Sequence, residues 1–310
     1  MLAWLFPGQG AQTVGMGKAL YEASPRAREV FERADAALGW KLSTLCFEGP
    51  DSELMLTANT QPAILTTSIA TLEALREAFP ELPAPTFVAG HSLGEYSALV
   101  AAGAIALEDA VRLVNLRGRA MQVAVPPGVG AMAAIIGATA EQITEICRNV
   151  SNGEVVSPAN FNAPGQIVIA GHAAAVERAK AAATASGQKV IPLKVSAPFH
   201  CALMAPAAQA LAEALTSVAL NTPRFPVVAN VNALPNQDAA EIPSLLFRQV
   251  DGTVCWEQSV RHMADAGVVR ALEIGPGNVL SGLVKRIDKR ITTLSVNSHE
   301  IFAKVPAFLG

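Results

Sequence analysis

The sequence predicts an α/β protein in which a small domain interrupts a larger one. A short apolar run, a glycine-rich turn and a helical segment follow one another at residues 2–38 and again at 86–102, which is typical of α/β folds. Between residues 131 and 195 the pattern is strand–helix–strand–strand–helix–strand, the ferredoxin-like order. Apolar runs at 226–231 and 271–274 are typical of buried parallel strands. We therefore expect a parallel sheet flanked by helices, with a small ferredoxin-like unit inserted into it.

The elements of the first part of the chain follow from apolar periodicity. A strand is expected at residues 2–6, and Pro7-Gly-Gln-Gly-Ala-Gln12 forms the turn after it. The pattern predicts helices over 21–38, 63–79, 95–102 and 106–123, and a strand over 86–90. The run Pro126-Pro-Gly128 ends this part and marks a domain boundary.

The segment after this boundary forms the predicted insertion. Thr139 and Gln142 fit a capping box that opens a helix ending near Val150. The remaining expected elements are strands at 131–137, 155–161, 166–170 and 189–195 and an Ala-rich helix at 173–185. Accordingly, we expect residues 127–197 to form the ferredoxin-like subdomain. Residues 1–126 and 198–310 are expected to form the larger domain.

The composition excludes several classes of protein. The chain has 310 residues, a net charge of -3, 51% hydrophobic residues and 16% charged residues. It is too apolar to be disordered, and it lacks the basic character of a nucleic-acid binder. The four cysteines form no CxxC pair and no zinc-ligand spacing with histidine, so we expect no metal. Gly8-Gln-Gly10 and Gly275-Pro-Gly277 each begin like a dinucleotide-binding fingerprint. Neither has the third glycine, so no cofactor is expected.

The apolar stretches do not indicate a membrane protein. The N-terminal run has no basic residues before it and is broken by Pro7-Gly8, so it is expected to be a strand and not a signal peptide. The uncharged stretch 120–140 is interrupted by prolines and glycines, so it cannot cross a membrane as one helix. We expect a cytoplasmic protein without a membrane partner.

The segment Gly90-His-Ser-Leu-Gly94 predicts a nucleophile at Ser92. It matches GxSxG, and it lies between a predicted strand and a predicted helix, the context that this motif requires. Small residues two before and two after the serine let the backbone turn sharply. The hydroxyl is then exposed beside the amino end of the next helix, where backbone N–H groups can stabilise an oxyanion. Without that context, a five-residue match would be expected often by chance.

A serine nucleophile needs a base, and the chain has five histidines. His200 follows the last strand of the predicted insertion, where the chain re-enters the larger domain and can reach a cleft. His91 is the second choice, because its side chain should point to the other side of the turn. No acid stands out as a partner for the histidine. A backbone carbonyl or an amide remains the alternative.

Together, these motifs resemble the acyltransferases of fatty acid and polyketide synthesis, above all the stand-alone bacterial members that transfer malonyl groups. The resemblance covers essentially the whole chain. It implies an α/β-hydrolase-like core with a parallel sheet and an inserted ferredoxin-like subdomain. The motifs that carry it are Gly8-Gln-Gly-Ala-Gln12, Gly90-His-Ser-Leu-Gly-Glu-Tyr-Ser-Ala98, Leu116-Arg-Gly-Arg-Ala-Met121, Asn160-Phe-Asn-Ala-Pro-Gly-Gln166, Pro198-Phe-His200 and Glu273-Ile-Gly-Pro-Gly277.

The resemblance also implies a reaction. Ser92 would take a malonyl group from malonyl-CoA and pass it to the phosphopantetheine thiol of acyl carrier protein, with His200 as base. The N–H groups of Gln9 and Leu93 would form the oxyanion hole. The main-chain carbonyl of Gln249 would orient the histidine, which supplies the partner that no acid provides.

The same resemblance makes Arg117 the partner of the malonyl carboxylate. Leu113, Arg117 and Met121 are spaced to share one helical face, and an arginine on such an apolar stripe is unusual. A buried guanidinium gives a carboxylate a bidentate, charge-assisted partner, whereas an acetyl group would leave its charge unpaired. Met121 and Asn162 complete the predicted substrate-binding set.

Two other functions remain open at this point. One is a malonyltransferase that loads the carrier of a malonate decarboxylase, and the other is a serine hydrolase. The expected carrier partner is acidic, so a basic patch near the cleft would suit it. The densest basic run, Lys285-Arg-Ile-Asp-Lys-Arg290, is the candidate patch, although a solvated helix end is the more common explanation of such a run.

Overall fold

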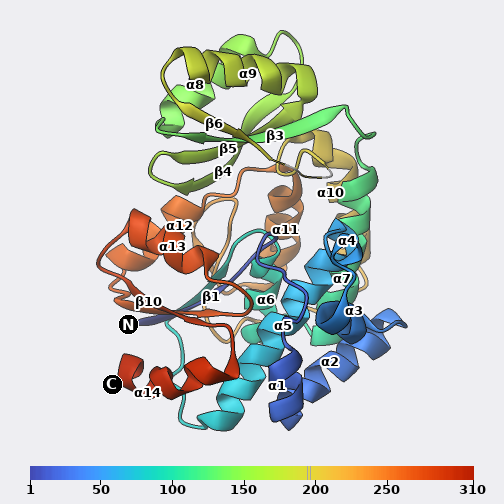
Figure 1. The fold of residues 1–310 in the computed structure, drawn as a ribbon, viewed down its shortest axis with the longest axis vertical. Coiled ribbons are helices and arrows are strands. Elements are labelled where there is room, and N and C mark those ends of the chain that lie inside the picture. The colour runs from blue at the N-terminus through green and yellow to red at the C-terminus, as the bar shows by residue number, and fades with distance from the viewer. Residues whose placement is uncertain (194, 196) are drawn as a thin grey trace.

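The computed structural model describes residues 1–193, 195 and 197–310. It consists of a six-stranded sheet with helices on both faces and a four-stranded sheet stacked at one end (Figure 1). The strand order of the large sheet is β10-β9-β1-β2-β7-β8. Its strands are β1 (Leu2–Phe6), β2 (Phe87–Gly90), β7 (Val227–Val228), β8 (Pro235–Asn236), β9 (Arg270–Ile274) and β10 (Thr292–Val296). The strands pair in parallel except β8, which runs antiparallel to β7.

The alternation of side chains along β1 explains why the large sheet is covered on both faces. Trp4 and Phe6 enter one apolar core, whereas Ala3 and Leu5 enter another, because successive strand residues point to opposite faces. The first core is covered by α2 (Pro25–Leu38), α5 (Thr57–Ala78), α6 (Gly94–Ala101) and α7 (Leu107–Val123). The second is covered by α12 (Trp256–Asp265) and α13 (Val279–Ile287). The remaining helices of this part are α1 (Lys18–Ala23), α3 (Leu42–Glu48), α4 (Asp51–Leu54), α10 (Ala205–Leu215), α11 (Ile242–Asp251) and α14 (Val305–Leu309).

The four-stranded sheet has the order β4-β5-β3-β6 and is antiparallel throughout. Its elements are β3 (Gly130–Ile136), α8 (Ala140–Val150), β4 (Val156–Ala163), β5 (Gln166–His172), α9 (Ala173–Ala185) and β6 (Lys189–Pro192). Helices α8 and α9 cover its outer face (Figure 1). The capping box of Thr139 and Gln142 is confirmed. Lys194, within the last predicted strand of this segment, and Ser196 lie outside the described residues.

Two predicted helices differ from the sequence pattern for identifiable reasons. The helix expected at 21–38 is two helices, because Ser24 leaves the helical conformation and caps α2 by accepting the Ala27 N–H. Helix α5 begins before Pro62, which provides no N–H for the carbonyl of Ala58 four residues earlier. The side-chain amide of Asn115 donates to that carbonyl at 2.8 Å, so the helix continues through the proline.

Three strands toward the two edges of the large sheet differ from the sequence pattern. The run expected at 226–231 contributes only two residues of strand, and β8 and β10 had no predicted counterpart. In the part of the chain that the structure describes, no helix is both long and apolar enough to cross a membrane.

Candidate active site

Ser92 lies on a sharp turn between β2 and α6 and has a φ of 51°, a strained value for a residue other than glycine. The turn requires its glycines. A Cβ on Gly90 would lie 2.0 Å from the carbonyl of Gly94, and one on Gly94 would lie 2.1 Å from the Phe6 oxygen. The turn brings the serine hydroxyl to the carboxyl edge of the large sheet.

Two side chains from distant elements hold the backbone of Ser92. Its N–H donates to Oδ1 of Asn230 at 2.6 Å, and its carbonyl accepts from Nε2 of Gln249 at 3.0 Å. Since the Ser92 N–H is already used, an oxyanion hole must be built from other N–H groups. Leu93 immediately follows the serine at the amino end of α6, and Gln9 lies on the turn after β1 and lines the same cavity.

His200 contacts the serine directly. Its Nε2 lies 2.8 Å from Ser92 Oγ, and its Nδ1 lies 2.9 Å from the main-chain oxygen of Gln249. Because a carbonyl only accepts, Nδ1 carries the proton, and Nε2 is free to accept the proton of the serine hydroxyl. Burial, aided by the positive charge of Arg117, lowers the pKa of His200 to about 3. The imidazole is therefore neutral at physiological pH, as a general base must be.

Arg117 is buried on α7 with 1% of its surface exposed. Its Nη1 donates to Gln61 Oε1 at 2.8 Å, and its Nη2 donates to Gln249 Oε1 at 2.9 Å and to Ser92 Oγ at 3.2 Å. The guanidinium also lies 5.5 Å from the centre of the Tyr96 ring. The predicted stripe is present, because Leu113 and Met121 are buried beside it. A fixed positive charge thus lies next to the nucleophile.

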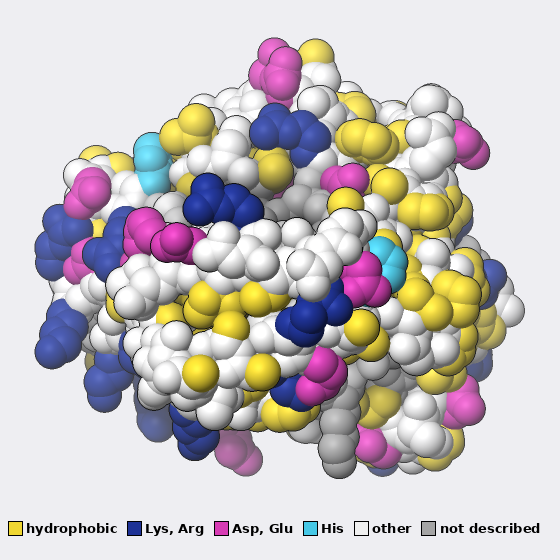
Figure 2. Space-filling view, turned by 90° about the horizontal axis from the view of Figure 1, so that it is seen from above, with side chains coloured by type: hydrophobic (Ala, Val, Ile, Leu, Met, Phe, Trp, Pro, Cys, Tyr) yellow, Lys and Arg dark blue, Asp and Glu magenta, His cyan; other side chains and the backbone are white. Residues whose placement is uncertain are grey.

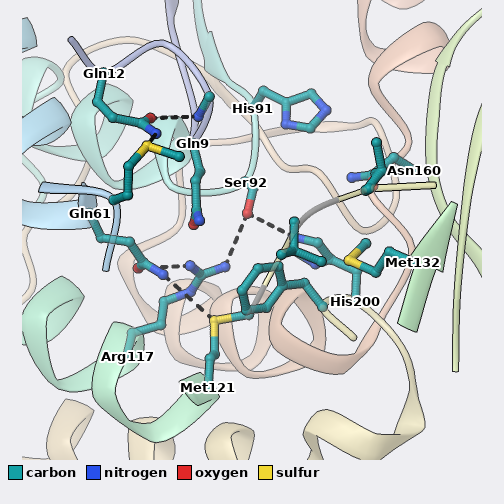
Figure 3. A pocket seen from close by; sticks show the side chains of 15 residues that line it. Gln9, Gln12, Gln61, His91, Ser92, Arg117, Met121, Met132, Asn160 and His200 are labelled. Carbon is teal, nitrogen blue, oxygen red and sulfur yellow. Dashed lines mark hydrogen bonds between the residues drawn. The ribbon is translucent and has the colours of Figure 1, made fainter. Parts of the chain in front are cut away.

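These groups open into a cavity of about 220 Å³ (Figure 3). The hydroxyl of Ser92 points toward Arg117 and His200, whereas the ring of His91 points away from it (Figure 3). The residues that line the cavity are Gln9, Gly10, Gln12, Met55, Gln61, His91, Ser92, Arg117, Met121, Met132, Asn160, Leu193, Val195, Phe199 and His200.

Asn162 is the predicted substrate-binding residue that does not line this cavity. Its Oδ1 lies 2.8 Å from Nε2 of His91, and Asn160 lines the cavity from β4 in its place. The two positions would share a face in a regular strand, but the register of β4 shifts between Phe161 and Ala163. This irregularity, which the sequence does not reveal, interrupts the alternation at Asn162.

Comparison with known proteins shows the family of this chain. The model of the acyl transferase domain family matches residues 3–298. A malonyl CoA-acyl carrier protein transacylase of Haemophilus influenzae is 49% identical over 99% of this chain and 98% of its own. The chain belongs to the acyl transferase family.

Solved structures give the same result for this acyltransferase. An acyl carrier protein S-malonyltransferase of Vibrio cholerae matches with a TM-score of 0.96 and 45% identity, over 98% of this chain and 99% of its own. A malonyl-transacylase in complex with its type II polyketide synthase acyl carrier protein matches with a TM-score of 0.94 and 47% identity, over 98% of both chains.

Other histidines and a cysteine of the acyltransferase make contacts that explain them as structural residues. Nδ1 of His172 accepts the Val155 N–H at 2.9 Å, and the ring of His262 packs against Phe87. The Cys201 thiol donates to the Pro198 carbonyl at 3.1 Å, and burial raises its pKa to about 11. This thiol is therefore protonated and packed, so it is not positioned as a second nucleophile.

Sequence reasoning missed three polar residues of the site: Gln61, Asn230 and Glu95. Gln61 is a helix residue 56 positions from its partner Arg117, and no local pattern singles it out. Asn230 follows β7, so its position at the carboxyl edge of a parallel sheet was the one available signal. Glu95 lies within the motif at residues 90–98, three residues after Ser92. A carboxylate in the first turn of a helix is ordinarily solvated and interacts with the helix dipole, so the sequence offered no reason to place it in the site.

Proposed function

We propose that this acyltransferase transfers the malonyl group of malonyl-CoA to the phosphopantetheine thiol of acyl carrier protein, supplying fatty acid synthesis. The observation that carries the proposal is the buried Arg117 guanidinium 3.2 Å from the Oγ of Ser92. A malonyl ester on that oxygen has its free carboxylate one methylene from the ester carbonyl. The guanidinium can therefore form charge-assisted hydrogen bonds to the carboxylate while the ester remains on the serine.

In the first half of the reaction, Ser92 Oγ attacks the thioester carbonyl of malonyl-CoA. His200 Nε2 takes the hydroxyl proton as the C–O bond forms, and the N–H groups of Gln9 and Leu93 stabilise the oxyanion. The C–S bond then breaks, and coenzyme A leaves as a thiol with the proton returned by His200. The carbonyl of Gln249 holds the imidazole in the required tautomer throughout.

In the second half, the carrier thiol attacks the malonyl-serine ester. His200 takes the thiol proton, the new C–S bond forms, and Ser92 leaves with a proton from His200. One thioester replaces another, so the reaction is reversible and follows a ping-pong scheme. The proposed chemistry uses no metal and no cofactor, because Ser92 and His200 supply both nucleophile and base.

Substrate selection is assigned to Arg117 and Met121. Acetyl-CoA brings no carboxylate, so its binding leaves the guanidinium without the partner that malonyl provides. Met121 lines the cavity one helical turn from Arg117 and supplies an apolar wall. Asn160, and not Asn162, is the proposed contact from the smaller sheet.

We assign the finer architecture on the same basis. The order of strands and helices between β3 and β6 supports a ferredoxin-like subdomain at 127–197, inserted into an α/β-hydrolase-like catalytic domain formed by 1–126 and 198–310. The catalytic serine at a strand–turn–helix junction supports the hydrolase-like description. We propose a cytoplasmic location, because the four cysteines are free thiols, which suits a reducing compartment.

The two residues of the proposed carrier-docking patch, Lys285 and Arg286, differ in their contacts. Basic side chains gather along the left edge of Figure 2, which is the side of α12 and α13 in Figure 1. Arg286, however, already donates to the Gln166 side chain and to the Pro164 carbonyl at 3.4 Å. A docking role therefore falls first to Lys285. Charge reversal of Lys285 should raise KM for carrier protein at low salt.

The test compares malonyl-CoA with acetyl-CoA as donors to the same acyl carrier protein, with formation of the carrier thioester as readout. The proposal expects a strong malonyl preference and a malonyl adduct on Ser92 by mass spectrometry. Ser92→Ala should form neither adduct nor product. Net release of free malonate without an acceptor would instead favour a serine hydrolase, and transfer only to a malonate decarboxylase carrier would favour the second alternative.

A further inference from the structure

Glu95 is a buried carboxylate with no part in the reaction just described. It lies in the first turn of α6, three residues after the nucleophile, and only 2% of its surface is exposed. Its Oε2 accepts the backbone N–H of Asn230 at 2.9 Å and the side-chain Nε2 of Gln249 at 2.8 Å. A buried carboxylate is costly, so its retention calls for a specific use.

The two groups that Glu95 holds are those that hold the nucleophile. Asn230 accepts the Ser92 N–H and also donates to the Gly90 carbonyl at 2.7 Å. Gln249 donates to the Ser92 carbonyl. The strained φ of Ser92 persists only where its surroundings fix it from several sides. Both of these residues donate to one oxygen atom of Glu95, Asn230 through its backbone N–H and Gln249 through its side-chain amide.

Gln249 extends this connection to the rest of the site. Its main-chain oxygen accepts from His200 Nδ1, and its side-chain oxygen accepts from Arg117 Nη2. An amide can flip, and the hydrogen bond to Glu95 favours the orientation in which Nε2 points away from Arg117. Glu95 holds Nε2, which directs the side-chain oxygen toward Arg117.

We propose that Glu95 is a positioning residue of the acyl transfer reaction, which holds Asn230 and Gln249 and through them the backbone of Ser92, the imidazole of His200 and the guanidinium of Arg117. It touches neither substrate nor reacting atoms. Glu95 thus acts on His200 indirectly: it holds the side chain of Gln249, whose main-chain carbonyl accepts from Nδ1 of the histidine. The assignment to acyl transfer rests on the proposed function, but the geometry of Ser92 does not.

The role belongs to the acceptor oxygen and not to the charge. Both hydrogen bonds end on Oε2, so a protonated carboxyl or a carboxamide can accept both with its carbonyl oxygen. Burial raises the pKa of Glu95 to about 7, so both protonation states are available near neutral pH.

The experiment compares two substitutions that separate position from charge. Glu95→Gln keeps an acceptor oxygen in place and removes the charge. Glu95→Asp keeps the charge and withdraws the oxygen by one methylene; Glu95→Met, with no acceptor, replaces it if the aspartate variant does not fold. Glu273→Asp is the matched control, because Glu273 is also fully buried and accepts the N–H groups of Leu280 at 2.9 Å and Ser281 at 2.8 Å, away from the cavity.

Two assays are run on equal amounts of folded protein. One measures the rate at which a fluorophosphonate labels Ser92, and the other measures kcat and KM for malonyl transfer. We expect Glu95→Gln to stay within about threefold of wild type, and Glu95→Asp to lose roughly tenfold to a hundredfold in labelling and kcat, the effect of a misplacement on the ångström scale. Glu273→Asp should lower the melting temperature without changing the labelling rate.

Three results would overturn the proposal. They are wild-type labelling in both Glu95→Asp and Glu95→Met, an equal loss in Glu95→Gln and Glu95→Asp, and a loss as large in the Glu273 control. Fluorophosphonate labelling does not require malonyl-CoA. A failure of the proposed substrate would therefore leave this test of Glu95 intact, and the two failures can be told apart.

Discussion

Nη2 of Arg117 lies 3.2 Å from Oγ of Ser92, so the charge that we propose selects the substrate contacts the proposed nucleophile before any substrate binds. Ser92 lies on the turn between β2 and α6, and Arg117 lies on α7, 25 residues later in the chain. We propose that this contact limits the length of an acyl group that can be esterified to Ser92 and bind Arg117 at the same time. A carboxylate one methylene from the ester carbonyl meets that requirement, whereas acetyl offers no carboxylate.

Replacing Arg117 should therefore change donor choice more than nucleophile reactivity. In Arg117→Ala, kcat/KM for malonyl-CoA should fall by about a hundredfold or more, since breaking a buried charge pair costs about 3–5 kcal/mol. The ratio of acetyl to malonyl transfer should rise. Arg119, two residues on and exposed, supplies the control, and Arg119→Ala should behave as wild type. Unchanged donor ratios in Arg117→Ala would remove the arginine from substrate selection.

The pH dependence of Ser92 reactivity reports the environment of His200. A histidine accepts a proton from serine only in its neutral form, which is present above its pKa. Burial first, and then the charge of Arg117, lower that pKa from 6.5 to about 3. Fluorophosphonate labelling should thus keep its rate as pH falls through 6.5, up to the onset of acid unfolding. A midpoint near 6.5 in the wild type would contradict the buried, neutral imidazole.

Arg117→Ala should move this acidic limb upward. Loss of the neighbouring positive charge removes one of the causes that lower the pKa of His200, so protonation begins at higher pH. Comparison of the labelling profiles of Arg117→Ala and Arg119→Ala separates this effect from a general change in helix charge. Coincident profiles would show that burial alone sets the pKa.

Glu95 makes a pH-dependent contribution to stability. Its folded pKa is raised from 4.5 to about 7, so between these values the folded state keeps a proton that the unfolded state releases. Stability is therefore lost as pH rises through this interval, by up to roughly 3 kcal/mol at about 1.4 kcal/mol per pKa unit. Glu95→Gln cannot titrate and so avoids this loss. The free energy of unfolding of the variant relative to that of wild type should therefore increase from pH 4.5 to 7 in denaturant titrations. A difference independent of pH would rule out this titration.

The glycines of the nucleophile turn are expected to tolerate no side chain. Gly94→Ala would force a Cβ to 2.1 Å from the Phe6 oxygen, so the turn must shift, and Ser92 labelling should be lost. Gly282 lies in α13 with nothing within 4 Å of an added Cβ. Gly282→Ala should raise stability by about 0.5–1 kcal/mol, because alanine favours the helix, and should leave labelling unchanged. Thermal unfolding and labelling of both variants make the comparison.

The contact between Asn115 and the Ala58 carbonyl allows a reciprocal test. Asn115→Ala should cost about 1–3 kcal/mol by leaving that carbonyl without its donor. Adding Pro62→Ala restores the missing backbone N–H of α5 and should recover part of the loss. A double-mutant cycle in denaturant measures the coupling. Additive effects of the two substitutions would mean that the side chain does not replace the proline N–H.

Local chemistry determined much of this protein. Gly90 and Gly94 permit the turn that exposes Ser92, and the capping box at Thr139 begins a helix where the pattern placed it, because these features depend on residues within a few positions. His200 was selected by its place after the last strand of the insertion. Arg117 was selected by an apolar helical stripe, and both lie at the nucleophile.

Tertiary structure decided how these groups are held. Asn230 and Gln249 lie 138 and 157 residues from Ser92, and they reach it because Asn230 follows β7, which pairs with β2, and Gln249 projects from α11. Asn160 lines the cavity and the predicted Asn162 does not, and the register of β4 shifts at this point. Glu95, for which the sequence indicated no role, is a buried carboxylate that holds Asn230 and Gln249. A side chain's partners depend on which elements the topology brings together, and no periodicity along the chain records that choice.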